Sequence, residues 1–250
     1  MKSSYDELPL SAERRPARYL LHPLRPLARF LIRRRIKVRI VDGHKLPARG
    51  PVILACNHVG VVDGPLLAIF APRPVHALTK QEMFKGFMNG FLLGAGQIPL
   101  DRFNPDPLAV KRCLRVLRDG GVVGIFPEGS RGAGEFDRFH TGAAYLALVT
   151  GAPIVPVVQF GTRDPGAGSH SLPSKGVTVD MVFGDPIQLP KRPWPRRKRE
   201  VADRSLELRE HLLAHLDHAK AVTGRTLPGP LPGKETDPDP ATGVTDAEAS

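Results

Sequence analysis

The sequence predicts a single α/β domain whose central sheet, mostly parallel or mixed, is flanked by helices. Short apolar runs typical of buried strands alternate along the chain with longer segments of helical periodicity. Three polar motifs directly follow predicted strands, and the carboxyl ends of strands are where open α/β sheets bind ligands. The length of 250 residues is sufficient to bury the core of one such domain.

Residues 1–34 are predicted to form a short helical segment that docks on a membrane. Leu27, Phe30 and Leu31 share one face of a helix, and arginines occupy much of the remainder. Prolines within the segment rule out one long helix, so we expect short helical pieces. A basic segment of this kind can also be merely a solvated face, and that alternative stays open.

The body of the domain is predicted to span residues 35–222. Residues 36–40 alternate apolar and basic side chains, which predicts an edge strand. The remaining strands are expected at residues 51–56, 75–79, 97–100, 122–126, 154–160 and 177–183.

Three segments of the body have the periodicity of helices. The clearest spans residues 107–119, with Asp106 as N-cap and Pro107 in the first turn. The others span about 141–150 and about 200–222. The longest apolar stretch, residues 86–100, contains several glycines and falls short of the roughly 20 apolar residues of a membrane span, so it is interpreted as a buried or interfacial segment.

The net positive charge lies at the periphery of the predicted body. Residues 1–40 hold 11 Lys/Arg against 3 Asp/Glu, and residues 191–199 hold six further basic side chains. Such patches suit an anionic surface, either a membrane or a nucleic acid. The tail, residues 223–250, holds two basic and five acidic side chains, and its Pro/Gly/Asp-rich composition predicts disorder. We expect no cleaved signal peptide, and two cysteines suggest a reducing compartment.

His58 and Asp63 follow the predicted strand 51–56 and lie five residues apart. On a continuous helix this spacing would place the side chains about 140° apart, so they can meet only if the helix begins between them. Gly60 and Gly64 make such an irregular start credible. Asp63 would then fix the imidazole tautomer and raise its basicity, and His58 would take a proton from an attacking hydroxyl. Alternatively, Asp63 is a simple N-cap and His58 a turn residue.

A polar loop of Glu128, Gly129, Ser130 and Arg131 follows the predicted strand 122–126. Glu128 would accept a hydrogen bond from a substrate hydroxyl, and the Arg131 guanidinium would pair with a phosphate. The alternative is an ordinary Glu-Gly-Ser turn with a solvated arginine.

Arg102 and Lys80 also come directly after predicted strands. The planar, permanently charged fork of Arg102 suits a phosphate that must be held, and Lys80 is a further candidate of the same type. The alternative for Arg102 is a surface pair with Asp101, which would contribute little.

Several other classes of site lack support. Cys56 precedes Asn57-His58, but successive strand residues point to opposite faces, so we expect its thiol in the core rather than acting as a nucleophile. The zinc hydrolase, serine hydrolase and P-loop motifs do not occur, and the histidines show no metal-ligand spacing. A catalytically inactive protein that binds nucleic acid or another anionic surface is an alternative, but the basic runs contain few aromatics and no recognised nucleic-acid module.

Together these motifs resemble the glycerolipid acyltransferase family typified by 1-acyl-sn-glycerol-3-phosphate acyltransferases. Four motifs of that family occur in its order over about residues 35–190: Asn57 to Asp63, Gly96 to Arg102, Phe126 to Arg131, and Val155 to Val157. The resemblance implies transfer of a fatty acyl group from acyl-CoA or acyl-carrier protein to the free hydroxyl of lysophosphatidic acid or a related lysophospholipid. The product would be phosphatidic acid, an intermediate of phospholipid biosynthesis.

The resemblance also implies roles for individual residues. The catalytic dyad falls on His58 and Asp63, and the arginine that binds the acceptor phosphate falls on Arg102. The acceptor-binding loop falls on Glu128, Gly129 and Arg131. Backbone N–H groups or a helix start would stabilise the oxyanion. No cofactor, metal or covalent intermediate is required, because the acyl donor is a co-substrate.

Two positions depart from the family pattern. Gly60 stands where serine is common, and His140 and Thr141 lie near a position that often offers lysine. Both departures leave the acceptor open, and a glycolipid or lipoamino acid is the alternative to a lysophospholipid.

The implied product also predicts a location. A phospholipid with two chains cannot diffuse through water, so we expect a peripheral enzyme on the cytoplasmic face of the cell membrane. The N-terminal segment and the basic run around Trp194 would dock there, with about 1 kcal/mol contributed by each charge near an anionic surface.

Overall fold

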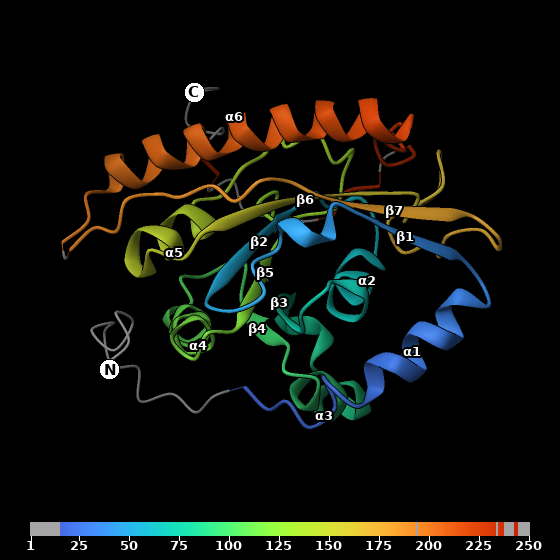
Figure 1. Ribbon diagram of the computed structural model, residues 1–250, viewed down its shortest axis with the longest axis horizontal. Helices are drawn as coiled ribbons and strands as arrows, with labels where there is room; N and C mark the ends of the chain where they lie inside the picture. The colour runs from blue at the N-terminus through green and yellow to red at the C-terminus, as the bar shows by residue number, and fades with distance from the viewer. Residues whose placement is uncertain (1–15, 194, 234, 238–242, 245–250) are drawn as a thin grey trace.

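The computed structural model describes residues 16–193, 195–233, 235–237 and 243–244. A seven-stranded sheet lies at its centre, with the strand order β1-β7-β6-β2-β5-β3-β4 (Figure 1). Neighbouring strands are parallel except β6 and β7, which are antiparallel. The strands are β1 Lys37–Val41, β2 Val52–Cys56, β3 Val75–Lys80, β4 Ile98–Leu100, β5 Val122–Ile125, β6 Ile154–Phe160 and β7 Thr178–Phe183. This mixed sheet confirms the predicted α/β class, and β1 lies at the edge as expected.

Helices cover both faces of the sheet (Figure 1). One face packs against α4, α5 and α6, and the other against α2, with α1 outside it. The helices are α1 Leu24–Arg33, α2 Asp63–Phe70, α3 Gly86–Gly94, α4 Pro107–Arg118, α5 Gly142–Thr150 and α6 Lys198–Thr223, with short 3-10 turns at Gly43–Lys45 and Gln81–Met83. β2 and β6, in the middle of the sheet, are fully buried because their strands are almost continuously apolar.

The three helices expected from periodicity are present with their predicted signals. Asp106 caps α4 by accepting a hydrogen bond from the Ala109 N–H at 2.9 Å. α5 ends at Gly151, whose φ of 70° is the left-handed conformation that favours glycine. The apolar stretch 86–100 divides into α3 and β4. The strand was expected, whereas the helix α3 was not predicted from the composition. Among the described residues, no helix has the length and apolarity needed to cross a membrane.

The described part of the tail returns to the body of the domain. Leu227 and Val244 pack against the core cluster beside α5 and α6. The buried guanidinium of Arg163 donates hydrogen bonds to the carbonyl oxygens of Gly229 and Pro230. The composition of residues 223–250 predicts disorder, yet these described residues make specific contacts with the domain.

Candidate active site

The turn between β2 and α2 brings His58 and Asp63 together. His58 Nδ1 lies 2.8 Å from Asp63 Oδ2. The same carboxylate oxygen accepts the backbone N–H groups of Val59 at 2.7 Å and Gly60 at 2.8 Å. α2 begins at Asp63, so the helix starts after His58, as the five-residue spacing requires. Asp63 therefore holds both the imidazole and the turn that carries it.

The His58 ring is held on two further sides. Its backbone N–H donates to Glu128 Oε1 at 2.8 Å, and its ring stacks on Phe126 with the centroids 4.4 Å apart. The side chain is only 14% exposed, and it borders the cavity described below. With Nδ1–H donated to Asp63, the Nε2 atom is left as the proton acceptor. This is the tautomer that a general base needs.

Asn57 joins the two central strands directly below the dyad. Its side-chain amide donates to the Gln159 carbonyl oxygen at 3.1 Å, and its Oδ1 accepts the Gln159 N–H at 2.8 Å. The Gln159 side chain in turn donates to the Asp63 carbonyl oxygen at 3.3 Å. Asn57 is fully buried, so these hydrogen bonds satisfy a polar group that would otherwise be costly. Its positioning role was missed from the sequence, because Gln159 lies about a hundred residues away.

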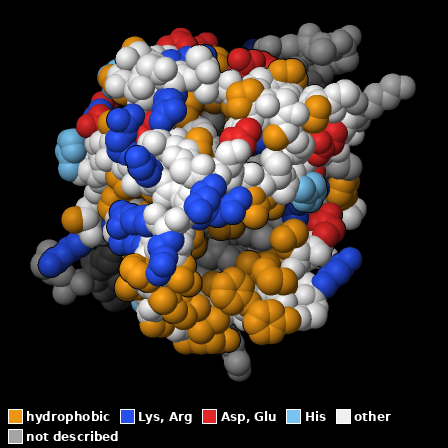
Figure 2. All heavy atoms as spheres, turned by 90° about the vertical axis from the view of Figure 1, so that its right-hand side faces the viewer, with side chains coloured by type: hydrophobic (Ala, Val, Ile, Leu, Met, Phe, Trp, Pro, Cys, Tyr) orange, Lys and Arg blue, Asp and Glu red, His pale blue; other side chains and the backbone are white. Residues whose placement is uncertain are grey.

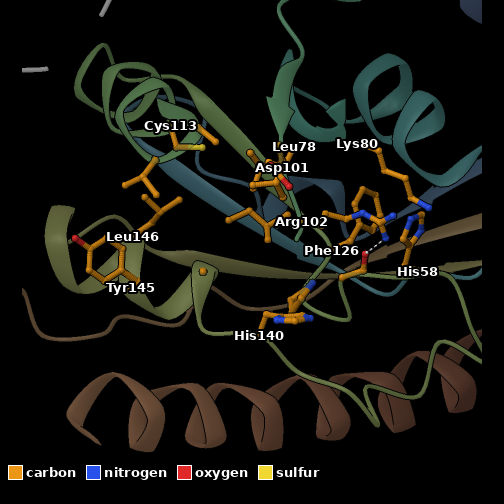
Figure 3. A pocket seen from close by; sticks show the side chains of 17 residues that line it. His58, Leu78, Lys80, Asp101, Arg102, Cys113, Phe126, His140, Tyr145 and Leu146 are labelled. Atoms are coloured by element: carbon orange, nitrogen blue, oxygen red, sulfur yellow. Dashed lines mark hydrogen bonds between the residues drawn. The ribbon is translucent and has the colours of Figure 1, made fainter. Parts of the chain in front are cut away.

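A cavity of about 250 Å³ opens at the carboxyl ends of the central strands. His58, Lys80 and Arg102 lie at one end of it, and Cys113, Tyr145 and Leu146 at the other (Figure 3). The rest of its wall is largely apolar: Leu78, Leu100, Ala109, Val110, Ile125 and Phe126. The cavity thus offers one cationic, base-bearing end and one apolar end.

The sequence-predicted cations Lys80, Arg102 and Arg131 meet around one carboxylate, that of Asp237. Arg131 donates to Asp237 Oδ2 from both Nε and its backbone N–H, at 3.0 Å each. Lys80 Nζ forms an ion pair with Oδ1, and the Arg102 guanidinium lies 3.9 Å from the same atom. Asp237 lies in the tail, and no pattern in the sequence pointed to it.

The Asp237 carboxylate is charged in this setting. Burial alone raises its pKa, but hydrogen bonds from Arg131 and Lys80 outweigh that effect and hold the pKa below its usual range. Its side chain is 3% exposed. The three cations therefore form an anion-binding site, which we call the anion cluster: Lys80, Arg102 and Arg131.

Glu128 holds the backbone of His58 in place. Its buried carboxylate accepts the His58 N–H, and it borders a separate hollow shared with Ser130. Burial raises the pKa of Glu128 to about 8, although the hydrogen bond from His58 opposes the shift. Gly129 offers its carbonyl oxygen to Arg102 at 3.1 Å. This geometry makes Glu128 a positioning residue, and its contact with an acceptor hydroxyl stays a prediction.

Gly60 is explained by close packing. A Cβ atom there would lie 3.2 Å from the Thr162 carbonyl oxygen and 3.3 Å from Arg163 Cβ. Gly60 does not border the cavity, whereas His140 does. The close contact with residues 162–163 thus accounts for glycine in place of serine at position 60. The change gives no direct indication of a different acceptor head group.

The backbone N–H groups of the turn are not available to an oxyanion. Those of Val59 and Gly60 donate to Asp63, that of His58 donates to Glu128, and that of Val61 donates to the Ser169 carbonyl oxygen at 3.0 Å. Any backbone N–H groups that stabilise the oxyanion therefore lie outside residues 58–61, and that expectation stays a prediction. Their hydrogen bonds build the dyad itself.

Two other expectations concern the surroundings of the site. Cys56 is fully buried in the core, as predicted, and burial raises the pKa of its thiol well above the ordinary value. In the part of the chain that the structure describes, no three His, Cys, Asp or Glu side chains are grouped to hold a metal ion.

Comparison with known proteins identifies the family. Residues 37–159 match the family model described as Acyltransferase. A 1-acyl-sn-glycerol-3-phosphate acyltransferase of Bacillus subtilis is 33% identical over 152 residues, which cover 60% of this chain and 73% of that protein. The chain belongs to the acyltransferase family. The resemblance drawn from the four sequence motifs is thereby confirmed, and the protein is an acyltransferase rather than an inactive binding protein.

Other members of this acyltransferase family extend the comparison. A 1-acyl-sn-glycerol-3-phosphate acyltransferase of Borreliella burgdorferi is 32% identical over 134 residues, which cover 52% of this chain and 53% of that protein. The chain thus matches about half the length of that relative. The crystal structure of PlsC, the 1-acyl-sn-glycerophosphate acyltransferase of Thermotoga maritima, aligns with a TM-score of 0.60 and 20% identity over 81% of this chain and 80% of that one. That structure shares the fold of the present acyltransferase.

Proposed function

We propose that this acyltransferase moves a fatty acyl group from acyl-CoA or acyl-carrier protein to the free hydroxyl of lysophosphatidic acid, giving phosphatidic acid. The observation that carries the proposal is the arrangement of one cavity, in which His58 and two members of the anion cluster share one end and apolar side chains line the other. The relatives from Bacillus and Borreliella are named as 1-acyl-sn-glycerol-3-phosphate acyltransferases, which supports the same acceptor.

The reaction requires only side chains of the protein. His58 Nε2 removes the proton of the acceptor hydroxyl as its oxygen attacks the thioester carbonyl carbon. The tetrahedral intermediate collapses, the C–S bond breaks, and the imidazolium returns the proton to the leaving thiolate. Asp63, 2.8 Å from Nδ1, stabilises the positive charge that the ring carries in between. We propose that no metal or cofactor takes part.

The anion cluster suits the phosphate of the acceptor. A phosphomonoester carries a charge of about −1.5 to −2 at neutral pH, and it presents oxygens that guanidinium groups bind bidentately. Arg102 is held for this role by its hydrogen bond to Gly129. Lys80 and Arg102 border the same cavity as His58. A phosphate bound to them therefore brings the glycerol hydroxyl of the acceptor into the cavity beside His58.

Replacing Arg102 by alanine is expected to raise the apparent KM for lysophosphatidic acid about tenfold or more, with a smaller effect on kcat, because one phosphate contact is lost in ground and transition states alike. Initial rates with labelled oleoyl-CoA and lysophosphatidic acid in detergent would measure both constants. Arg115→Ala, on the surface of α4, is the matched control and should leave KM unchanged. An unaltered KM in Arg102→Ala would indicate an acceptor without phosphate, such as a glycolipid.

We further propose that the enzyme docks on the cytoplasmic face of the membrane through α1 and α3. The basic face of α1 is turned inward, toward the end of α2. The Ile69 carbonyl oxygen accepts hydrogen bonds from Arg25 at 3.0 Å and from Arg29 at 2.8 Å, and both arginines also donate to the Ala71 carbonyl oxygen. Cations at a helix C-terminus are stabilised by its dipole, which explains this orientation. The apolar face of α1 is consequently left to solvent, the reverse of an ordinary surface helix.

The exposed apolar surface is continuous with that of α3. Figure 2 shows an apolar patch at the lower part of one face, bordered by Lys and Arg side chains. The Leu20 N–H donates to the Gly94 carbonyl oxygen at 3.1 Å, which joins the segment before α1 to the end of α3. We call these side chains the apolar patch: Leu24, Leu27, Phe30 and Leu31 from α1, with Phe87, Met88, Phe91 and Leu93 from α3. Phe87 is 86% exposed, and an apolar patch of this kind marks an interaction surface.

Substituting Phe30 and Phe87 by serine is expected to reduce binding to phosphatidylglycerol vesicles at least tenfold, because each aromatic ring buried in the bilayer contributes apolar area. Co-sedimentation with vesicles would measure it. The matched control, Leu172→Ser, changes an exposed apolar side chain outside the patch. Undiminished binding of the double variant would reject this docking surface. The basic run around Trp194 was predicted to dock as well, but Trp194 lies outside the described residues.

A further inference from the structure

We propose that Asp237 acts as an internal competitor of the acceptor: its carboxylate occupies the anion cluster when no phosphate is bound, and the tail must leave before the acceptor can bind. The inference rests on the proposed function in one respect, namely that the anion cluster receives the acceptor phosphate. It adds a regulatory contact within the chain that neither the dyad nor the reaction requires.

The contacts of Asp237 are those of a bound anion. Both carboxylate oxygens are engaged, Oδ2 by the side chain and backbone N–H of Arg131 and Oδ1 by Lys80, with Arg102 3.9 Å away. Guanidinium, ammonium and backbone N–H donors are also the groups that bind phosphate in proteins. The carboxylate thus makes the interactions that a phosphate would make, and the two anions cannot occupy the cluster together.

The charge balance favours exchange for a phosphate. Three cations of the cluster surround the carboxylate of Asp237, and Glu235 also interacts electrostatically with Arg131. Even with both carboxylates counted, positive charge is left over. Burial is the main cause that lowers the pKa of Lys80, and the charges of Arg131 and Arg102 lower it further, against the hydrogen bond and the charge of Asp237, which raise it. A phosphomonoester, with a charge closer to −2, neutralises the cluster more fully than one carboxylate does.

The tail is attached beside the cluster at two further points. The Glu235 carboxylate accepts hydrogen bonds from the Ser169 hydroxyl at 2.6 Å and from the Ser169 N–H at 2.9 Å. Arg163 binds the carbonyl oxygen of Gly229, which has a φ of 78°. These attachments keep Asp237 at high effective concentration near the anion cluster, so a single carboxylate competes with a dissolved ligand.

Asp237 reaches the cationic end of the cavity from the tail. Lys80 and Arg102 border the cavity together with His58, whereas Asp237 itself comes from a segment after α6. The tail therefore reaches the polar end of the cavity from outside the sheet. When the tail leaves, the cations are uncovered and the strands stay in place. Lys80 is the last residue of β3, and Arg102 follows β4.

Replacing Asp237 by asparagine in the full-length protein is expected to tighten phosphate binding. If the tail occupies the cluster for about nine tenths of the time, the apparent affinity rises about tenfold when it is released. Glycerol 3-phosphate is the soluble probe, and its Kd would be measured by titration calorimetry. The apparent KM for lysophosphatidic acid should fall by a similar factor, while the KM for monoacylglycerol, which lacks the phosphate, should not change.

Three variants make the test specific. Asp237→Glu keeps the carboxylate and should bind the probe nearly as weakly as the native protein. Asp217→Asn, on the exposed side of α6, removes the same charge elsewhere and should have no effect. Ser169→Ala removes the hydroxyl that donates to Glu235 and keeps every charge in place, so it loosens the attachment alone and should lower the Kd by a smaller factor than Asp237→Asn. It also supplies the test if Asp237→Asn proves unstable in thermal unfolding.

The opposite result would overturn the proposal. If Asp237→Asn weakens binding of glycerol 3-phosphate, or leaves its Kd unchanged, then Asp237 orients Arg131 and Lys80 and does not compete. Failure of the proposed function looks different: the Kd would respond to Asp237→Asn, but no variant would acylate lysophosphatidic acid. A raised KM in Arg102→Ala together with an unaltered Kd in Asp237→Asn would reject only the competition.

Discussion

Replacing His58 by alanine is expected to lower kcat for acyl transfer about 10³-fold, because a positioned general base contributes roughly 10² to 10⁴ in rate. The loss should fall mainly on kcat, since the ring borders the cavity without belonging to the anion cluster. Single-turnover rates with oleoyl-CoA would measure the chemical step directly.

Folding should survive the His58 substitution. The His58 N–H that binds Glu128 belongs to the backbone and is retained in alanine, and Asp63 keeps its hydrogen bonds to Val59 and Gly60. Circular dichroism and the Tm would check this. His218→Ala, on the exposed face of α6, is the matched control. Wild-type turnover by a folded His58→Ala protein would contradict the assignment of the dyad.

Replacing Asp63 by asparagine is expected to lower kcat at least 10²-fold and to destabilise the protein as well. A neutral amide stabilises the imidazolium less than a carboxylate does, and its oxygen accepts more weakly from the N–H groups of Val59 and Gly60. Kinetics and thermal unfolding of the same preparation would separate the two effects. Asp101→Asn, at the rim of the cavity, tests for a general effect of lost charge.

A loss of stability without a loss of rate in Asp63→Asn would give Asp63 only the role of holding the turn. That outcome would correspond to the simpler interpretation of the sequence, in which the aspartate serves the helix start and the histidine is a turn residue. The 2.8 Å contact between Nδ1 and Oδ2 leads us to expect the opposite.

The parts of the site that could be predicted from the sequence are those encoded over a few residues. The meeting of His58 and Asp63 follows from a strand that ends at Cys56 and a helix that starts after Gly60, and both are local signals. Lys80 and Arg102 come together because β3 and β4 are neighbouring parallel strands, so residues at or just after their carboxyl ends lie at one edge of the sheet.

The parts that could not be predicted depend on contacts between distant residues. Asp237 lies 157 positions from Lys80, in a segment whose composition is that of disordered chains. The direction of α1 was similarly open, because an amphipathic pattern defines two faces without saying which one meets the protein. Its arginines were expected to meet an anionic surface, yet Arg25 and Arg29 bind the end of α2. The sequence of α1 does not indicate that backbone carbonyl groups at the end of another helix will bind its arginines.

The short helix α2 connects the dyad with the contact made by α1. Asp63 stands at its first residue, and the carbonyl oxygens that bind Arg25 and Arg29 lie at its end. The eight residues of α2 span about 12 Å. If the enzyme docks on a bilayer through α1, as we propose, the length of α2 determines the distance between that bilayer and the dyad. On the proposed docking, a count of helical residues would set how deep the dyad lies relative to the membrane interface, and with it the part of a lipid that reaches His58.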